Sequence, residues 1–220
     1  MKVTLITAYY KNEELTKEFL DNLKDKLTID TEVIVVNAES KPIEHPLITK
    51  RVDLEENKGF SNSMNAGLKE ATGDYIIIIG NDGFPKDEHW IEELIRIEQL
   101  TKAGIVAPEA SKPHFKAITR NDNSHNKKEN YSIVNFYPAI CWMITKETLK
   151  EVGLFDEEYG IGTYEDNDYI QRLKLSSKPL VVVSHKYILE HRLSKTFGLF
   201  KNSSSIMSKN FKLYKEKWKI

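Results

Sequence analysis

The feature that most constrains this 220-residue chain is a short apolar run, Tyr75 to Ile79, lying between Gly73-Asp74 and Gly80-Asn81-Asp82-Gly83. A β-branched run bounded by glycines predicts a strand buried on both faces, and such strands belong to parallel sheets covered by helices. Asp82 therefore follows the carboxyl end of a central strand. Open α/β sheets bind their ligands at that edge, where the loops separate into a crevice. Asp82 is thus the first candidate functional residue.

Strand-like and helix-like patterns alternate along the chain, which is typical of an α/β fold built from βαβ units. Segments 12–26 and 85–101, for example, carry apolar residues at helical spacing. We expect a single α/β domain over residues 1–200, with a mainly parallel, Rossmann-like sheet flanked by helices. Residues 201–220 predict a basic amphipathic C-terminal helix.

The charge balance is nearly even, with 32 basic and 33 acidic residues and a formal net charge of -1. Nucleic acid is therefore an unlikely partner. A lone cysteine, Cys141, fits a reducing compartment, and no segment is long and apolar enough to be a signal-peptide core or a membrane span. We expect a cytoplasmic protein. The basic, aromatic-containing C-terminal helix could also contact the inner face of a membrane peripherally.

A second acidic group, Glu165-Asp166-Asn167-Asp168, stands at a predicted helix start. Acids at that position stabilise a helix through capping and the helix dipole, which is the structural interpretation. Three carboxylates within four residues nevertheless repel one another unless a cation or a proton-transfer role relieves the repulsion. The group is therefore a candidate for acid–base chemistry.

Taken in order along the chain, these motifs resemble those of the family 2 glycosyltransferases of the GT-A fold, which transfer sugars from nucleotide-sugar donors. The similarity covers nearly the whole chain, and its specificity lies in the order and spacing of the motifs. The matching segments are Thr7-Ala8-Tyr9, Asn57-Lys58-Gly59-Phe60, Asn65-Ala66-Gly67, Ala71-Thr72-Gly73-Asp74-Tyr75, Gly80-Asn81-Asp82, Gly153-Leu154-Phe155-Asp156-Glu157, Glu165-Asp166-Asn167-Asp168 with Arg172, and His191.

The resemblance implies an inverting transfer to an acceptor hydroxyl of a glycan or another alcohol. Asp166 is the implied general base, and Glu165 would hold the acceptor or tune the pKa of its neighbour. Asp82 and His191 are the implied ligands of a divalent Mn²⁺ or Mg²⁺ that neutralises the leaving diphosphate. A single displacement with one base needs no covalent enzyme intermediate.

The resemblance also implies contacts to the donor and to the acceptor. A UDP-sugar is the favoured donor, although Ala38 stands where the family usually has a base-binding acid or amide, and Glu39 or Asn37 could take that role. Gly80 replaces the first acid of the D-x-D motif, so that motif offers one carboxylate. The implied nucleotide-binding residues are Thr7, Ala8, Tyr9, Glu39, Asn57, Asn65, Asn81 and Asp82, and the implied acceptor residues are Trp142 and Asp168.

Several alternatives remain open from the sequence. Trp142 follows an apolar run and could be a core residue as readily as a sugar-stacking one. A nucleotidyltransferase that makes a nucleotide sugar would also use carboxylate-bound metal, but the loop at 8–12 lacks the glycine-rich phosphate-binding sequence of that class. A non-catalytic module that binds a glycan, nucleic acid or membrane is the third possibility. Specificity is expected in the loops at 109–130 and 160–164.

Overall fold

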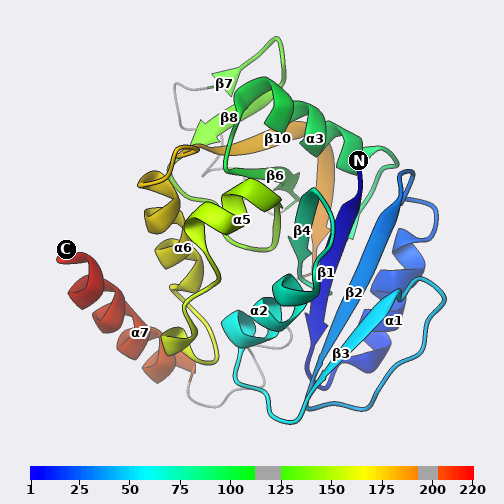
Figure 1. Ribbon diagram of the computed structural model, residues 1–220, viewed down its shortest axis with the longest axis horizontal. Helices are drawn as coiled ribbons and strands as arrows, with labels where there is room; N and C mark the ends of the chain where they lie inside the picture. The colour runs from blue at the N-terminus through cyan, green and yellow to red at the C-terminus, as the bar shows by residue number, and fades with distance from the viewer. Residues whose placement is uncertain (112–124, 193–202) are drawn as a thin grey trace.

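The computed structural model describes residues 1–111, 125–192 and 203–220, which form a mixed sheet with helices on both faces (Figure 1). The strand order is β3-β2-β1-β4-β9-β6-β10-β8-β7, and β5 pairs with β10 beside this path. The strands are β1 Val3–Tyr9, β2 Thr31–Ala38, β3 Lys50–Leu54, β4 Tyr75–Ile79, β5 Gly83–Pro85, β6 Ile105–Ala110, β7 His125–Asn126, β8 Tyr131–Val134, β9 Cys141–Thr145 and β10 Val181–His191. The helices are α1 Glu13–Leu23, α2 Phe60–Glu70, α3 Trp90–Thr101, α5 Lys146–Val152, the 3₁₀ turn η1 Glu157–Tyr159, α6 Glu165–Lys174 and α7 Ser203–Trp218.

The expected α/β fold with flanking helices is confirmed, but the sheet is less parallel than expected. Strands β3, β2, β1 and β4 run parallel. Beyond them, β9 runs antiparallel to both β4 and β6, and β10 returns parallel to β6. All five residues of β9 are buried. A fully buried run has the same apolar pattern in either direction, so the sequence could not reveal the reversal.

The central strand β4 is buried on both faces, as its composition predicts. Ile77 and Ile79 join a core cluster with side chains of α1 and α3, whereas Ile76 and Ile78 join a second cluster with side chains of α2 and α6. Burying each of these side chains stabilises the fold by about 1.5–3 kcal/mol. The strand is therefore a rigid base for the loop that follows it.

Helix α2 lies close against the sheet because Gly67 has no side chain. A Cβ atom at this position would lie 2.4 Å from Cγ2 of Ile6 on β1, which is too close for any real contact. The close approach of α2 to β1 fixes where the N-terminus of α2, at Phe60, meets the edge of the sheet.

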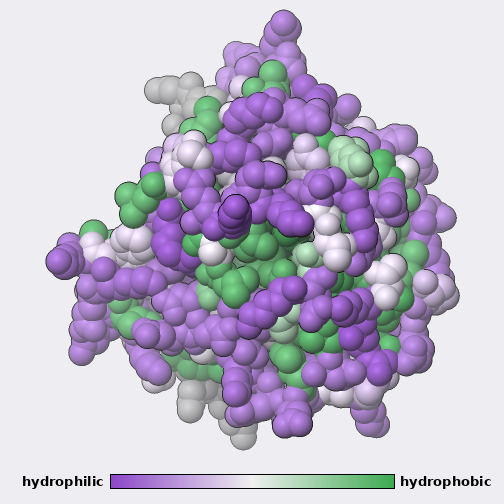
Figure 2. Space-filling model, in the orientation of Figure 1, coloured by the Kyte–Doolittle hydropathy of each residue, from purple (hydrophilic) through white to green (hydrophobic). Residues whose placement is uncertain are grey.

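The outer surface on this side is mostly hydrophilic, with apolar side chains gathered between α2 and α5 (Figure 2).

Two segments differ from expectation or lie outside the description. The helix expected over 85–101 begins at Trp90, because Gly83–Pro85 forms β5 and pairs antiparallel with β10. Of the polar segment 109–130, residues 112–124 lie outside the described residues. Within the described ranges, no helix combines the length and apolarity that a membrane span requires.

Candidate active site

A cavity of about 450 Å³ lies at the carboxyl ends of β1, β2 and β4, and this volume is in the range of small-molecule sites. Its position is the one that an open α/β sheet predicts for a ligand. The lining residues come from strand ends, loops and helices α2, α6 and α7: Ala8, Tyr9, Tyr10, Ala38, Asn57, Gly59, Phe60, Ser63, Met64, Gly80, Asn81, Asp82, Pro138, Ala139, Ile140, Ile161, Gly162, Thr163, Glu165, Asp166, His191 and Met207.

Asp82 and His191 meet at the cavity although they are far apart in the sequence. The antiparallel pairing of β5 with β10 places His191 opposite Gly83, and the backbone N–H of Arg192 donates to the carbonyl oxygen of Asp82 at 2.9 Å. The Oδ2 atom of Asp82 then lies 3.3 Å from Nε2 of His191. The structure therefore brings together the two residues predicted as metal ligands.

This pair has the chemistry of a partial metal site. A carboxylate oxygen and an imidazole nitrogen are a donor set that Mn²⁺ accepts more readily than Ca²⁺ does. Across residues 1–111, 125–192 and 203–220 no group of three His, Cys, Asp or Glu side chains is placed to hold an ion. A cation bound by Asp82 and His191 would therefore take its other ligands from the donor diphosphate and water, as Mg²⁺ and Mn²⁺ commonly do.

Glu165 and Asp166 form the first turn of α6 and line the same cavity. Oδ1 of Asp166 accepts a hydrogen bond from the N–H of Asn167 at 2.8 Å, and the carboxylate also accepts one from the N–H of Ala139. The Glu165 side chain is buried, and its Oε2 atom has no hydrogen-bond partner among the described residues. A buried carboxylate oxygen without a hydrogen-bond partner, beside a cavity, indicates that the Glu165 carboxyl binds a ligand or holds a proton there.

Burial shifts the titration of both acids. It raises the pKa of Asp166 above the ordinary aspartate value, against the opposing effect of the backbone N–H donors. It also raises the pKa of Glu165, and the neighbouring Asp166 carboxylate adds to that rise by repulsion. The pKa of Asp166, raised toward neutral pH, suits this carboxylate to accept a proton from an alcohol at physiological pH, whereas Glu165, whose pKa is raised further, tends to retain its proton.

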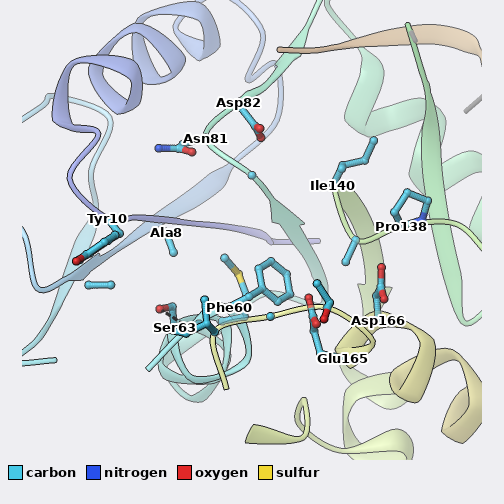
Figure 3. A pocket seen from close by; sticks show the side chains of 18 of the residues that line it. Ala8, Tyr10, Phe60, Ser63, Asn81, Asp82, Pro138, Ile140, Glu165 and Asp166 are labelled. Carbon is cyan, nitrogen blue, oxygen red and sulfur yellow. Dashed lines mark hydrogen bonds between the residues drawn. The ribbon is translucent and has the colours of Figure 1, made fainter. Parts of the chain in front are cut away.

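The two acidic centres face one cavity from different directions (Figure 3). Asn81 and Asp82 lie on one side, and Glu165 and Asp166 lie on the other. We call Ala8, Asn81, Asp82 and His191 the Asp82 wall, and residues 161–166 together with Met207 the Asp166 wall. The space between the walls can hold one ligand that contacts both.

Four of the predicted nucleotide-binding residues other than Asp82 line the cavity, namely Ala8, Tyr9, Asn57 and Asn81. The hydroxyl of Tyr9 donates to the carbonyl oxygen of Lys41 at 2.9 Å. The Nδ2 atom of Asn81 donates to Oγ1 of Thr16 on α1 at 2.9 Å, so the amide is fixed in place. The side chains of Tyr9 and Asn81 are therefore held in place by other parts of the protein.

The other three predicted nucleotide-binding residues do not line the cavity. Thr7 is fully buried within β1, and Glu39 is exposed and accepts a hydrogen bond from the N–H of Asn57 at 3.0 Å. The Asn65 amide bridges α2 to Phe155, with its Oδ1 accepting from the N–H and its Nδ2 donating to the carbonyl oxygen. Glu39 and Asn65 instead support the loops around the cavity.

The prediction that Trp142 contacts the acceptor is wrong in this structure. Its side chain is fully buried, and its ring lies 6.2 Å from that of Phe155 and 5.8 Å from that of Tyr169. An indole enclosed by other aromatic rings has no face left for a sugar. Trp142 is a core residue, which was the other interpretation of its sequence context.

Asp168 is likewise placed away from the cavity, contrary to its prediction as an acceptor residue. The carboxylate is fully buried and accepts from Nε of Arg172 at 3.0 Å and from Nε1 of Trp218 at 3.0 Å. Lys217 lies 2.8 Å from it as well. The sequence signal for this buried ion pair was Arg172, which stands four residues after Asp168, because that spacing favours an ion pair on one helix.

The sequence did not identify several residues of the Asp166 wall and its surroundings. Ile161, Gly162 and Thr163 fall in the loop for which specificity was expected, but no side chain there was singled out. Pro138 and Met207 carried no signal, because their place at the cavity depends on contacts between distant segments. Gly59 did carry a signal, as part of the Asn57-Lys58-Gly59-Phe60 motif, and the structure gives the reason for a glycine there, because a Cβ atom would lie 2.0 Å from the carbonyl oxygen of Gly160.

The chain belongs to the glycosyl transferase family 2, whose model matches residues 4–153. This assignment makes it a glycosyltransferase and disfavours the nucleotidyltransferase and the non-catalytic alternatives. The matched segment includes Asp82 but ends before Glu165, so the role of the second acidic centre depends on the geometry of the cavity.

Individual relatives agree with this family. The chain is 24% identical over 188 residues to the uncharacterized glycosyltransferase YwdF of Bacillus subtilis, covering 78% of this chain and 68% of that protein. Among solved structures, the mannosyltransferase PcManGT from Pyrobaculum calidifontis, in complex with GDP-Man and Mn²⁺, superposes with a TM-score of 0.70 at 17% identity over 88% of this chain and 57% of its own. Residues 1–349 of S. aureus TarS, in complex with UDP-GlcNAc, superpose with a TM-score of 0.68 at 15% identity over 94% of this chain and 64% of theirs. The chain thus spans less than two thirds of either solved chain, and these identities establish the fold alone.

Proposed function

We propose that this protein transfers a sugar from a nucleotide-sugar donor to an acceptor hydroxyl with inversion at the anomeric carbon. The observation that carries the proposal is the shared cavity, which has Asp82 with His191 on one wall and Glu165 with Asp166 on the other (Figure 3). A transferase must stabilise a leaving diphosphate and deprotonate an incoming alcohol at the same time. The two walls supply groups for these two tasks.

On the Asp82 wall, Asp82 and His191 would hold a divalent cation, with Mn²⁺ favoured and Mg²⁺ possible. When bound, such a cation neutralises the charge that develops on the departing nucleoside diphosphate. The side chains of Asn81 and Asn57 would position the nucleotide beside it. The donor bound to PcManGT and that bound to TarS are both nucleotide sugars, which supports this class of donor.

On the Asp166 wall, the Asp166 carboxylate would accept the proton of the acceptor hydroxyl as its oxygen attacks the anomeric carbon. The raised pKa of this carboxyl brings its proton affinity closer to that required at neutral pH. Glu165, with one carboxylate oxygen lacking a partner among the described residues, would receive a hydrogen bond from the acceptor. No second carboxylate needs to attack the sugar, so one displacement inverts the anomeric carbon.

The donor nucleotide is tested by thermal shift with UDP, GDP, ADP and CDP, each with Mn²⁺, with Mg²⁺ and with EDTA. We expect UDP with Mn²⁺ to stabilise the protein most, because ligands stabilise the state that binds them. EDTA should remove most of the shift. Equal stabilisation by every diphosphate in EDTA would contradict a cation-dependent donor site.

We further propose that α7 can contact an anionic membrane surface. Lys209, Lys212 and Lys215 are exposed on this helix, and Met207 and Phe211, although they also contact the cavity and Tyr164, remain 49% and 42% exposed. Such a surface binds anionic lipid through charge and shallow apolar insertion. Flotation with vesicles of anionic lipid, but not of zwitterionic lipid, would support this contact, and equal flotation or none would contradict it.

A further inference from the structure

The loop that leads into the acidic pair has an unusual backbone. Thr163 and Tyr164 have φ values of 77° and 70°, and Gly160 and Gly162 have φ values of 58° and 142°. A β-branched residue such as threonine rarely adopts a positive φ, so this conformation persists only where surrounding contacts impose it. Glu165 follows directly, and the loop therefore determines how α6 begins.

The start of α2 packs against this loop at Gly160, and side-chain contacts to the loop come from α7, which lies beside α6 in Figure 1. The Asn210 side chain is 2% exposed, and its Nδ2 atom donates to the carbonyl oxygens of Tyr159 and Gly162, each at 2.7 Å. The same Nδ2 atom also lies 3.2 Å from the carbonyl oxygen of Thr163, so the two hydrogens of the amide NH₂ group join the turn before the loop to the loop itself. The Tyr164 ring also packs against the ring of Phe211, with centroids 5.4 Å apart.

A second set of contacts fixes the far end of α7 to α6. Nε1 of Trp218 donates to the buried carboxylate of Asp168 at 3.0 Å, and Nε2 of Gln171 donates to the hydroxyl of Tyr214 at 2.9 Å. Helix α7 is thus held along its length by the helix that carries the acidic pair. Met207, one helical turn before Asn210, lines the cavity itself.

We propose that Asn210 is a positioning residue for the transfer reaction, whose side-chain amide holds loop 160–164 in its strained conformation so that Glu165 and Asp166 face the cavity. This inference rests on the proposed function of Asp166 as the general base. The Asp82 wall is held differently, by the pairing of β5 with β10. The loss of Asn210 should therefore affect the proton-transfer side and spare the binding of the nucleotide.

The test compares Asn210→Ala and Asn210→Asp with the control Lys209→Ala, an exposed change one residue away on the same helix. Turnover is measured as release of UDP from a set of UDP-sugars, and binding is measured with UDP and Mn²⁺. Displacement of a catalytic group by about 1 Å can cost about 100-fold in rate, so we expect kcat to fall by about 10- to 100-fold in both Asn210 variants. Affinity for UDP with Mn²⁺ should stay at the wild-type value.

Two further measurements separate positioning from a general loss of structure. Hydrogen exchange should increase at 159–164 in the Asn210 variants and stay unchanged in β1 and β4. The acid limb of the kcat–pH profile should move to lower pH, because a loosened loop admits water to the buried pair. Asn210→Asp should be no milder than Asn210→Ala despite its similar size, since a carboxylate cannot donate to the two carbonyl groups.

The outcomes are distinguishable. A wild-type kcat in Asn210→Ala, together with an inactive Asp166→Asn, would overturn the positioning role and leave the proposed function intact. Parallel loss of kcat and of UDP affinity would also overturn it, because the residue would then serve only the fold. Normal turnover in Asp166→Asn would instead overturn the proposed base.

Discussion

The two walls of the cavity are built by different means. The Asp82 wall comes from the ends of β1 and β10 and from the loop that follows β4, and the pairing of β5 with β10 fixes Asp82 against His191. The Asp166 wall comes from a strained loop and a helix start that are held by side chains of α7. The comparison teaches that backbone pairing within the sheet is enough to fix Asp82 against His191, whereas the loop before the acid pair is held by side-chain contacts from another helix.

The largest expected effect is on the Asp166 wall. Asp166→Asn keeps the size of the side chain but removes the proposed proton acceptor, so we expect turnover to fall by about 10²- to 10⁴-fold. Affinity for UDP with Mn²⁺ should remain at the wild-type value, because the proposed function assigns that ligand to the other wall. Single-turnover kinetics and calorimetry measure the two quantities. Asp87→Asn, an exposed change outside the cavity, is the matched control.

The next effect is on the Asp82 wall. Asp82→Ala removes the carboxylate of the Asp82–His191 pair. We expect Mn²⁺-dependent affinity for UDP to fall by about 10- to 100-fold, because even the loss of a residue that hydrogen-bonds to a metal ligand typically weakens metal binding by this factor. Calorimetry at fixed UDP and varied Mn²⁺ measures this, with Asp87→Ala as the control. If the affinity for UDP changes neither with the substitution nor with EDTA, nucleotide binding does not use a cation held by Asp82.

The smallest expected effect is on stability. The pKa of Glu165 is raised by burial and by Asp166, so between the ordinary value of 4.5 and the higher folded value the native state holds a proton that the unfolded chain releases. Stability therefore falls as pH rises through this window. Glu165→Gln removes that dependence and should become the more stable form at the upper end, by on the order of 1 kcal/mol, or about 2–4 °C in Tm.

Thermal unfolding of Glu165→Gln and wild type from pH 5 to pH 8 measures this difference. Glu158→Gln, an exposed change seven residues earlier, is the control. If the difference in Tm between Glu165→Gln and wild type does not grow with pH, the pKa of Glu165 is not raised in the folded protein.

The Asp82 wall was largely predictable, because its information is local. A buried β-branched run followed by Gly80-Asn81-Asp82 specifies a central strand and the loop at its carboxyl end, and β4 with Asp82 confirms both. The approach of His191 was expected only from the family resemblance. What the pattern missed was the short strand β5, since three residues at Gly83–Pro85 give too little periodicity to predict pairing with β10.

The Asp166 wall was predictable only in part. The acids at 165–166 were identified, but the pattern could not show that Asp168, two residues later, faces Arg172 and Trp218 and not the cavity. The positive φ at Thr163 and the role of Asn210 depend on tertiary contacts that leave no periodic trace in the sequence. Trp142 illustrates the same limit, because an aromatic residue after an apolar run fits a core and a sugar-binding surface equally well.

The most direct test of the account is the anomeric configuration of the first product. Proton NMR of the glycoside, recorded before mutarotation or a second transfer can alter it, reports whether the donor's configuration is inverted or kept. One alcohol, deprotonated by one carboxylate and attacking from the side opposite the diphosphate, predicts complete inversion. Retention of configuration would contradict the roles assigned to the two walls.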